Sequence, residues 1–154
     1  MKSYFLWLVW VVIYLSISST IGQVTQSSAE IELWYQGLMK SFLTPPDYVF
    51  PIAWSFLYVL IATAGWNTWH NDADKDVKIL FLLYTIFNWS WSFVFFEAQE
   101  INVAFGWILM VNFLNIYFMI KAWKPARWAS FAMILPLLWT CFAAYLNFEI
   151  WRLN

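Results

Sequence analysis

Five long stretches of this chain contain no charged side chain, and this pattern limits the possible folds more than any other feature. They comprise residues 3–29, 48–69, 79–96, 101–120 and 128–148. A helix needs about 20 mostly apolar residues to cross the hydrocarbon core of a bilayer, and the stretches match this length. Only 11% of the residues are charged and 63% are hydrophobic, whereas soluble domains carry about 25% charged residues. The expected fold class is therefore an all-α membrane protein, a bundle of five transmembrane helices.

These stretches and the polar turns between them define a single transmembrane domain over residues 1–154. Its helices are predicted at about 4–22, 46–69, 77–96, 101–120 and 127–151. The first stretch is similar to a signal peptide, but no clear small-residue cleavage site follows its apolar core, which favours a retained helix. Pro136 should kink the last helix, because a proline frees the carbonyl four residues before it.

The connection over residues 23–45 is the most polar long segment and is expected to form a long, partly helical first loop. Ser27 or Ser28 can cap a short helix over Ala29–Met39, which has two glutamates in its first turn. Pro45-Pro46 then disfavours helix before it and favours a new helix after it. A polar segment that leads directly into a membrane helix suggests a lid over a pocket.

Lysine and arginine residues are distributed unevenly between the two sides of the predicted bundle. The N-terminus and the second and fourth loops hold six of them, whereas the first and third loops and the C-terminus hold Lys40 and Arg152. The positive-inside rule therefore predicts a cytoplasmic N-terminus and a first loop outside. The net charge of −1 gives no reason to expect nucleic acid as a partner. The single cysteine, Cys141, lies in an apolar run, where a buried hydrophobic role is expected.

Polar and aromatic side chains inside the predicted spans suggest a ligand pocket. Trp54 and Trp139 stand several residues inside their helices, Asn88 lies on a polar face of the third helix, and Ala143 shares a face with Trp139. Indoles offer stacking area and an N–H donor, amides bind carbonyls or carboxylates, and Ala143 and Gly65 would leave room for a flat ligand. For Asn88 plain helix packing is an equal alternative, because membrane helices often use asparagine only to join neighbouring helices.

Short motifs run in order from about Trp34 to Asn154. They are Trp34-Tyr35, Thr44-Pro45-Pro46, Val49-Phe50 with Trp54 and Leu57-Tyr58, Asn88 with Trp91-Ser92 and Phe95-Phe96, Leu135-Pro136 with Trp139, and Phe142-Ala143, Leu146-Asn147, Trp151-Arg152 and Asn154. Each is weak alone, but all of them in this order, in a chain with five spans, form a specific pattern. The sequence resembles the TspO/MBR family of translocator proteins, tryptophan-rich sensory proteins and peripheral-type benzodiazepine receptors.

The resemblance implies a membrane receptor, transporter or sensor whose pocket opens towards the first loop. Its expected ligands are porphyrins such as protoporphyrin IX and haem, together with isoquinoline or benzodiazepine-type compounds. Porphyrin is a ligand in this scheme, so no cofactor is required and no metal site is expected. The pocket positions of the family fall here on six residues: Tyr35, Trp54, Asn88, Trp139, Ala143 and Leu146.

The resemblance also implies partners beyond the bilayer. Bacterial relatives are often homodimers, and the short chain fits a protein of a bacterial membrane. Family members also bind sterols through a motif near the end of the fifth helix. In this chain that region has Phe148, which lacks the tyrosine hydroxyl of the motif, and Glu149, which adds a charge. Sterol is therefore a weaker expectation than porphyrin.

Three functions from different classes fit these observations. The first is binding of tetrapyrroles for transport or sensing. The second is an enzymatic activity, the light- and oxygen-dependent breakdown of bound porphyrin, in which Trp54 and Trp139 would be the catalytic, redox-active indoles. The third is a helical membrane partner whose tryptophans only anchor it in the bilayer. Saturable porphyrin binding, followed by illumination, separates the three.

Overall fold

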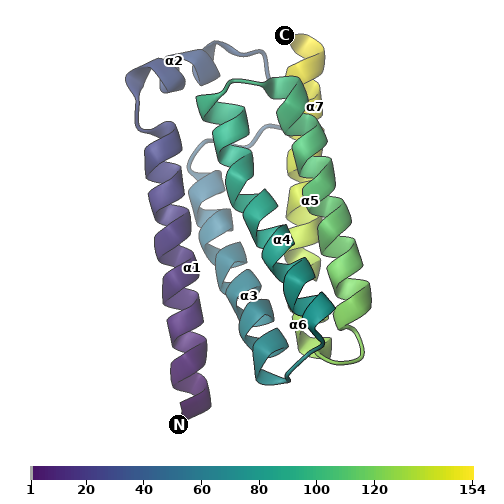
Figure 1. The fold of residues 1–154 in the computed structure, drawn as a ribbon. Coiled ribbons are helices and arrows are strands. Elements are labelled where there is room, and N and C mark those ends of the chain that lie inside the picture. Colours follow the sequence, from purple (N-terminus) through teal and green to yellow (C-terminus); the bar gives the residue numbers. More distant parts are fainter. Residues whose placement is uncertain (1) are drawn as a thin grey trace.

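The computed structural model describes residues 2–154, which form helices and no strands (Figure 1). Five helical segments are long and apolar enough to cross a membrane, which confirms the predicted fold class. The two termini lie at opposite ends of the bundle (Figure 1), as an odd number of spans requires. The elements are α1 (Lys2–Gln26), α2 (Ala29–Gly37), α3 (Val49–His70), α4 (Lys75–Ser92), the π-helix η1 (Phe93–Glu97), α5 (Ile101–Ala122), α6 (Arg127–Ala132) and α7 (Ile134–Leu153).

The first helix continues to Gln26, past the predicted end near residue 22. Its polar side chains bond within the helix, since the Thr25 hydroxyl donates to the carbonyl of Ile21 at 2.9 Å. The Gln23 amide likewise donates to the Ser19 hydroxyl at 3.2 Å. The predicted C-terminal end of this helix was placed where the apolar run stops, near residue 22. The helix continues for about one more turn through polar residues, up to Gln26.

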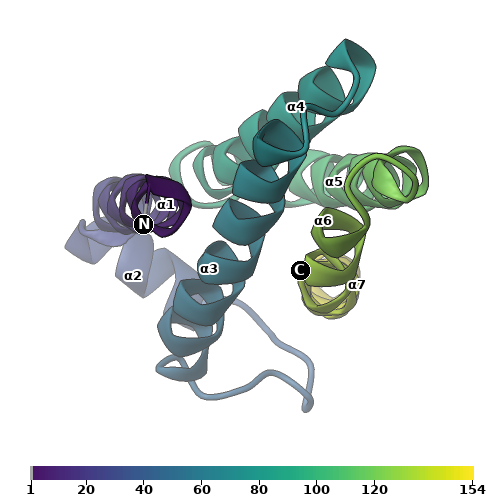
Figure 2. The ribbon, with the colours of Figure 1, turned by 90° about the horizontal axis from the view of Figure 1, so that it is seen from below.

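The first loop contains the short helix α2 and then crosses to the far side of the bundle. The Ser28 hydroxyl caps α2 by accepting from the Ile31 backbone N–H at 3.1 Å. Beyond α2 the chain reaches α7, where the Ser41 and Tyr145 hydroxyls are hydrogen-bonded at 3.1 Å. Figure 2 shows α3 between α1 and α7, with this connection passing around the outside of α3. The next helix begins at Val49, whose N–H donates to the Pro46 carbonyl at 2.9 Å.

The last span is broken at Met133, between α6 and α7, one turn before Pro136. The predicted kink is therefore present as a one-residue interruption. The Asn115 side-chain amide donates to the Met133 carbonyl at 3.4 Å. The same carbonyl accepts from the Leu137 N–H at 3.0 Å, so the bond from Asn115 ties α5 to the break in addition to the bonds of the helix. Asn115 is fully buried and serves this break.

The two ends of the bundle are packed differently. At the end that holds the N-terminus, aromatic rings from α1, α3, α4 and α5 form a dense core, with Trp10 against Trp69 (5.2 Å between ring centroids) and Phe81 against Phe118 (5.4 Å). A Cβ atom on Gly65 would lie 2.6 Å from the Trp10 ring and 2.7 Å from the Phe81 ring. Gly65 therefore makes room for these two rings and not for a ligand, which corrects the expectation from the sequence.

Cys141 also differs from its expected place. Its side chain is exposed on the outer surface of α7, in the membrane-spanning part of that helix. An apolar neighbourhood in a membrane protein includes the lipid, so hydrophobic sequence context alone does not distinguish a core residue from a lipid-facing one.

Candidate functional site

At the end that holds α2, the long helices enclose a cavity of about 530 Å³. This volume lies within the range of about 300–1,000 Å³ that is typical of small-molecule sites. Side chains from α1, α3, α4, η1, α5 and α7 form its walls, and α2 contributes to its roof. All six residues predicted as a pocket line this one cavity; their assignment as ligand-binding residues stays a prediction.

The wall from α7 carries three of these residues. Trp139, Ala143 and Leu146 are spaced by four and three positions, so they lie on one helical face. The Trp139 indole N–H is buried and has no hydrogen-bond partner. Phe50 from the start of α3 contacts the Trp139 ring edge-on at 6.1 Å between centroids. An unpaired buried donor is costly. Because the nitrogen is buried, a ligand acceptor in the cavity reaches it only if the ring shifts.

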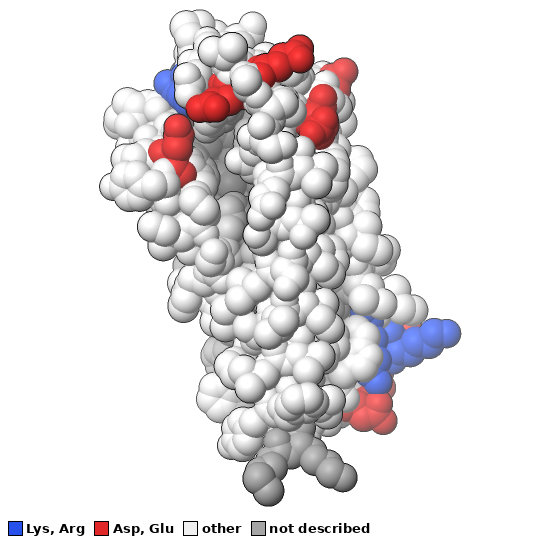
Figure 3. Space-filling model, turned by 90° about the vertical axis from the view of Figure 1, so that its left-hand side faces the viewer, with Lys and Arg blue, Asp and Glu red and all other residues white. Residues whose placement is uncertain are grey.

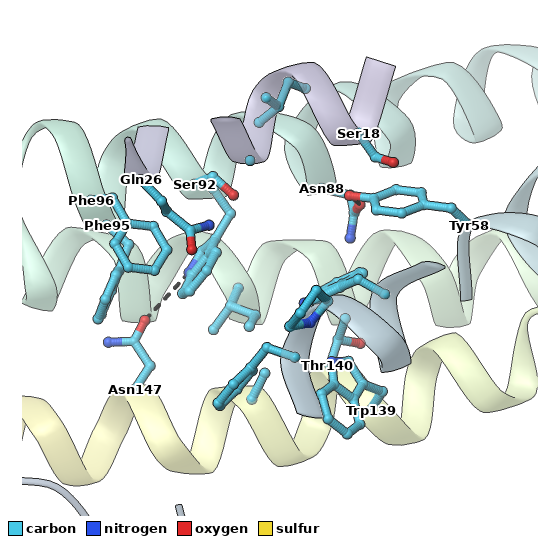
Figure 4. A pocket seen from close by; sticks show the side chains of 18 of the residues that line it. Ser18, Gln26, Tyr58, Asn88, Ser92, Phe95, Phe96, Trp139, Thr140 and Asn147 are labelled. Carbon is cyan, nitrogen blue, oxygen red and sulfur yellow. Dashed lines mark hydrogen bonds between the residues drawn. The ribbon is translucent and has the colours of Figure 1, made fainter. Parts of the chain in front are cut away.

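A second wall comes from α3 and α4. The Trp54 ring stacks on Tyr58 with centroids 5.4 Å apart and planes inclined by 30°. The Tyr58 hydroxyl in turn donates to the Asn88 side-chain carbonyl at 3.1 Å. Asn88 thus has both of its proposed roles: it joins two helices and it lines the cavity, and Figure 4 shows its amide nitrogen directed towards the α7 side.

A third wall comes from α1, and sequence reasoning missed it. Ser18, Gly22 and Gln26 repeat every four residues and line the cavity together with Ser19 and Gln23. Figure 4 shows Ser18 and Gln26 across the cavity from Trp139, Thr140 and Asn147 of α7. The signal was present as a polar stripe at helical spacing, but the early predicted end of the helix assigned its last members to a loop.

Aromatic rings close the upper end of the cavity. In the π-helix η1 the Ala98 N–H donates to the Phe93 carbonyl at 2.9 Å. This wider turn directs the consecutive residues Phe95 and Phe96 to the same side, where Phe96 lies 5.7 Å from Tyr35. Such π-turns are frequent at functional sites. Nothing in the sequence indicated one here.

Tyr35 is the residue of α2 that reaches the cavity. Burial, and to a smaller extent the negative charge of Asp47, raises the pKa of Tyr35 to about 12. Its hydroxyl therefore stays protonated at physiological pH and can donate a hydrogen bond. Lys40 anchors the same segment, since its ammonium donates to the carbonyls of Tyr35 and Leu38 and lies 4.3 Å over the Tyr35 ring.

The loop that follows α2 is fastened to the C-terminal end of α7. The Asn154 side chain accepts from the Met39 N–H and donates to the Met39 carbonyl, both at 3.0 Å. With the bond between Ser41 and Tyr145, these contacts hold the loop over the cavity. A lid at this place was predicted, and its fastening to the last residues of the chain was not.

Other polar residues of the bundle lie away from the cavity. Asn112 and Asn115 are buried in α5 but do not line the cavity. His70 is exposed at the opposite end of the bundle, where it stacks on Trp66 at 4.9 Å. Residues 2–154 contain no group of three or more His, Cys, Asp or Glu side chains placed to hold a metal ion.

Comparison with known proteins places the chain in a family. The model of the TspO/MBR family matches residues 9–152. The chain is 32% identical over 130 residues to the tryptophan-rich protein TspO of Archaeoglobus fulgidus, covering 83% of this chain and 84% of that protein. It is 29% identical over 121 residues to the tryptophan-rich sensory protein of Cereibacter sphaeroides, covering 79% and 77% of the two chains. It is also 28% identical over 126 residues to the human translocator protein, covering 79% and 75%. The chain is thus a multi-pass membrane protein that belongs to the TspO/MBR family.

Proposed function

We propose that this protein is a tetrapyrrole receptor that binds a porphyrin of the protoporphyrin IX type in the cavity beneath the first loop, for transport or sensing. The observation that carries the proposal is the pair of indoles that line one cavity from two helices, Trp54 of α3, which stacks on Tyr58, and Trp139 of α7. Aromatic rings from two walls suit a flat, largely apolar ligand. The same walls suit smaller aromatic amides, such as isoquinoline or benzodiazepine-type compounds.

The names of the relatives support a role in transport or sensing. The protein of Cereibacter sphaeroides is called a sensory protein and the human protein a translocator. Residues of the lining also bear on the form of the ligand. Among the described residues no His, Cys or Met lines the cavity, and these are the usual protein ligands of haem iron, apart from tyrosine. Two tyrosines, Tyr35 and Tyr58, do line it, so haem and the metal-free porphyrin are both candidate ligands.

A second candidate function is light-dependent breakdown of the bound porphyrin. One observation favours it: both indoles line the same cavity as the proposed ligand, so Trp54 and Trp139 are available as redox-active groups. Excited porphyrin and molecular oxygen would supply the oxidising chemistry. This activity needs no acid–base residue in the lining.

Protoporphyrin IX should quench the tryptophan fluorescence of the purified protein saturably in the dark. Trp139→Phe keeps a ring but removes the N–H, and should weaken binding about tenfold, equivalent to about 1.4 kcal/mol. Trp123→Phe is the control, because Trp123 lies at the opposite end and is 47% exposed. Unsaturable quenching would reject both functions, and equal effects of the two substitutions would reject the role of Trp139. If the absorbance of the bound porphyrin does not change under light, porphyrin breakdown is rejected and binding is the function that remains.

We further propose that the N-terminus is cytoplasmic and the cavity opens to the outer side, as the distribution of lysine and arginine favours. In a Cys141→Ala background, Glu30→Cys should react with a membrane-impermeant maleimide on intact cells. Lys124→Cys should react only after the cells are permeabilised. Both residues are exposed at opposite ends of the bundle, so the reverse labelling pattern would establish the opposite orientation.

A further inference from the structure

A second hollow lies on the outer surface of the bundle, in the seam between α3 and α7. It is a groove of about 370 Å³, and every side chain that lines it is apolar. The groove falls within the membrane-spanning parts of both helices, so the acyl chains of the lipid reach it. Figure 3 shows the corresponding belt on one face of the molecule, where charged side chains gather towards the two ends and leave the middle free of them. Besides Trp139, the groove is lined by Ala53, Phe56, Leu57, Leu135, Leu138 and Phe142.

The Trp139 ring separates this groove from the cavity inside the bundle. Among the described residues it is the only one that lines both spaces. It stands at the boundary between two faces of α7. Ala143 and Leu146, which follow it, line the cavity, whereas Leu135 and Leu138 precede it and line the groove. On this side of the protein, one indole therefore stands between the ligand space and the bilayer.

No hydrogen bond holds the Trp139 ring in its place. Its N–H is buried without a partner, and the rings of Phe50 and Phe142 contact it edge-on, with centroids 6.1 and 5.9 Å away. Trp91, another indole of the cavity wall, is fastened more firmly, because its N–H donates to the Ala104 carbonyl at 3.1 Å. Rotation of the Trp139 ring, in contrast, breaks no hydrogen bond.

The last span is also interrupted next to the groove. The break between α6 and α7 lies at Met133. Pro136, in the first turn of α7, has no N–H to bond the carbonyl of Ala132. Helices bend most readily at such positions. The turn that carries Leu135 can therefore shift relative to α3 more easily than a turn within a continuous helix.

The end of the cavity beneath the first loop is closed by stronger contacts. Asn154 holds Met39 by two hydrogen bonds of 3.0 Å, and Ser41 is bonded to Tyr145 at 3.1 Å. Passage through the loop requires these bonds to break, and it leads into water, where a flat apolar compound is poorly solvated. Passage through the seam between α3 and α7 leads into the lipid, where such compounds concentrate.

We propose that Trp139 is a gate between the cavity and the bilayer. When its ring turns outwards into the groove, the two spaces join, and apolar compounds dissolved in the lipid enter the cavity between α3 and α7. The ring returns after the compound has passed, so the gate controls the rates of entry and exit and leaves the bound state unchanged. The proposal rests on the proposed function for the compound that passes, and adds the route by which it reaches the site.

A cysteine in the cavity tests the gate without any tetrapyrrole. In a Cys141→Ala background, Ala143→Cys places a thiol one turn from Trp139 on the cavity wall. Membrane vesicles are treated with N-phenylmaleimide, which dissolves in lipid, or with a charged maleimide, which stays in water. Ala53→Phe adds a ring inside the groove. It should slow the reaction with N-phenylmaleimide about tenfold and leave the rate with the charged reagent unchanged.

The matched control is Ile52→Phe, which adds a ring to the neighbouring residue of α3. Ile52 is 66% exposed and does not line the groove, so this variant should change neither rate. Leu138→Trp fills the groove from α7 and should act as Ala53→Phe does, so the result does not depend on the folding of one variant. Equal rates with N-phenylmaleimide in all three variants overturn the proposal. A cavity thiol that does not react with N-phenylmaleimide at all overturns it as well.

Binding kinetics provide the second test. The dimethyl ester of protoporphyrin IX carries no carboxylate and enters the bilayer. In Ala53→Phe its association and dissociation should both slow about tenfold at unchanged Kd, because the gate lies on the path and not at the site. Asn154→Ala loosens the loop and should change neither rate. Faster exchange in Asn154→Ala, with normal rates in Ala53→Phe, would establish the loop as the route and overturn the proposal. If the ester does not bind, the proposed function fails, and the thiol reaction still decides whether the gate exists.

Discussion

Gly65→Val should destabilise the bundle by about 1–3 kcal/mol, the usual cost of inserting carbon atoms into a packed core. The new Cβ would lie within 2.8 Å of ring atoms of both Trp10 and Phe81. Phe81 cannot retreat, since it is fully buried and packs on Phe118 and Trp69. The strain should therefore push α1 outwards through Trp10, and because α1 forms one wall of the cavity, ligand affinity should fall as well.

The matched control is Gly106→Val on α5. A Cβ at Gly106 meets no atom within 4 Å, and the residue is exposed. The two variants make the same chemical change in the middle of a helix, so they share any cost of helix propensity. Thermal unfolding in detergent compares their stabilities, and hydrogen exchange in α1 locates the change. Equal melting temperatures for the two variants would contradict the prediction, because they would show that the packing of Trp10 and Phe81 around Gly65 tolerates the added side chain.

The sequence predicted the spans because charge and length are sufficient to define them. In lipid every backbone group must bond internally, so a charge-free stretch of this length has few alternatives to a helix. The cavity walls from α3 and α7 were also predictable, because Trp54 and Trp139 lie too deep in their spans to be interfacial anchors. Hydrophobicity could not show which side of a helix faces lipid, and Cys141 and Gly65 were misplaced for that reason.

The remaining walls depend on features that composition does not encode. The polar stripe of α1 becomes a wall only because the helix extends to Gln26, which depends on hydrogen bonds beyond the apolar run. The orientation of Phe96 depends on the π-turn of η1, a difference of one residue in the hydrogen-bonding pattern. The fastening of the loop by Asn154 joins residues 115 positions apart. The first two are hydrogen-bonding patterns within a helix that the residue types did not indicate, and the third is a tertiary contact between distant parts of the chain.

Ala143→Phe should weaken porphyrin binding tenfold or more, equivalent to at least about 1.4 kcal/mol, with little loss of stability. Ala143 lies one turn from Trp139 and from Asn147 on the α7 wall, and all three line the cavity. A benzyl group there would occupy ligand space. Because the space is empty in the protein itself, the new ring need not displace packed core atoms, unlike the valine at Gly65.

Cys141→Phe is the control on the same helix. Its side chain is exposed towards the lipid, so the same aromatic ring is added to α7 without entering the cavity. Fluorescence titration with protoporphyrin IX dimethyl ester should give wild-type affinity for Cys141→Phe and strongly reduced affinity for Ala143→Phe, at similar melting temperatures. Unchanged affinity in Ala143→Phe would place the ligand elsewhere on the protein. An equal loss of affinity in both variants would point to a general effect of aromatic bulk on α7. The difference in affinity between the two variants is therefore the measurement that assigns the ligand to the cavity.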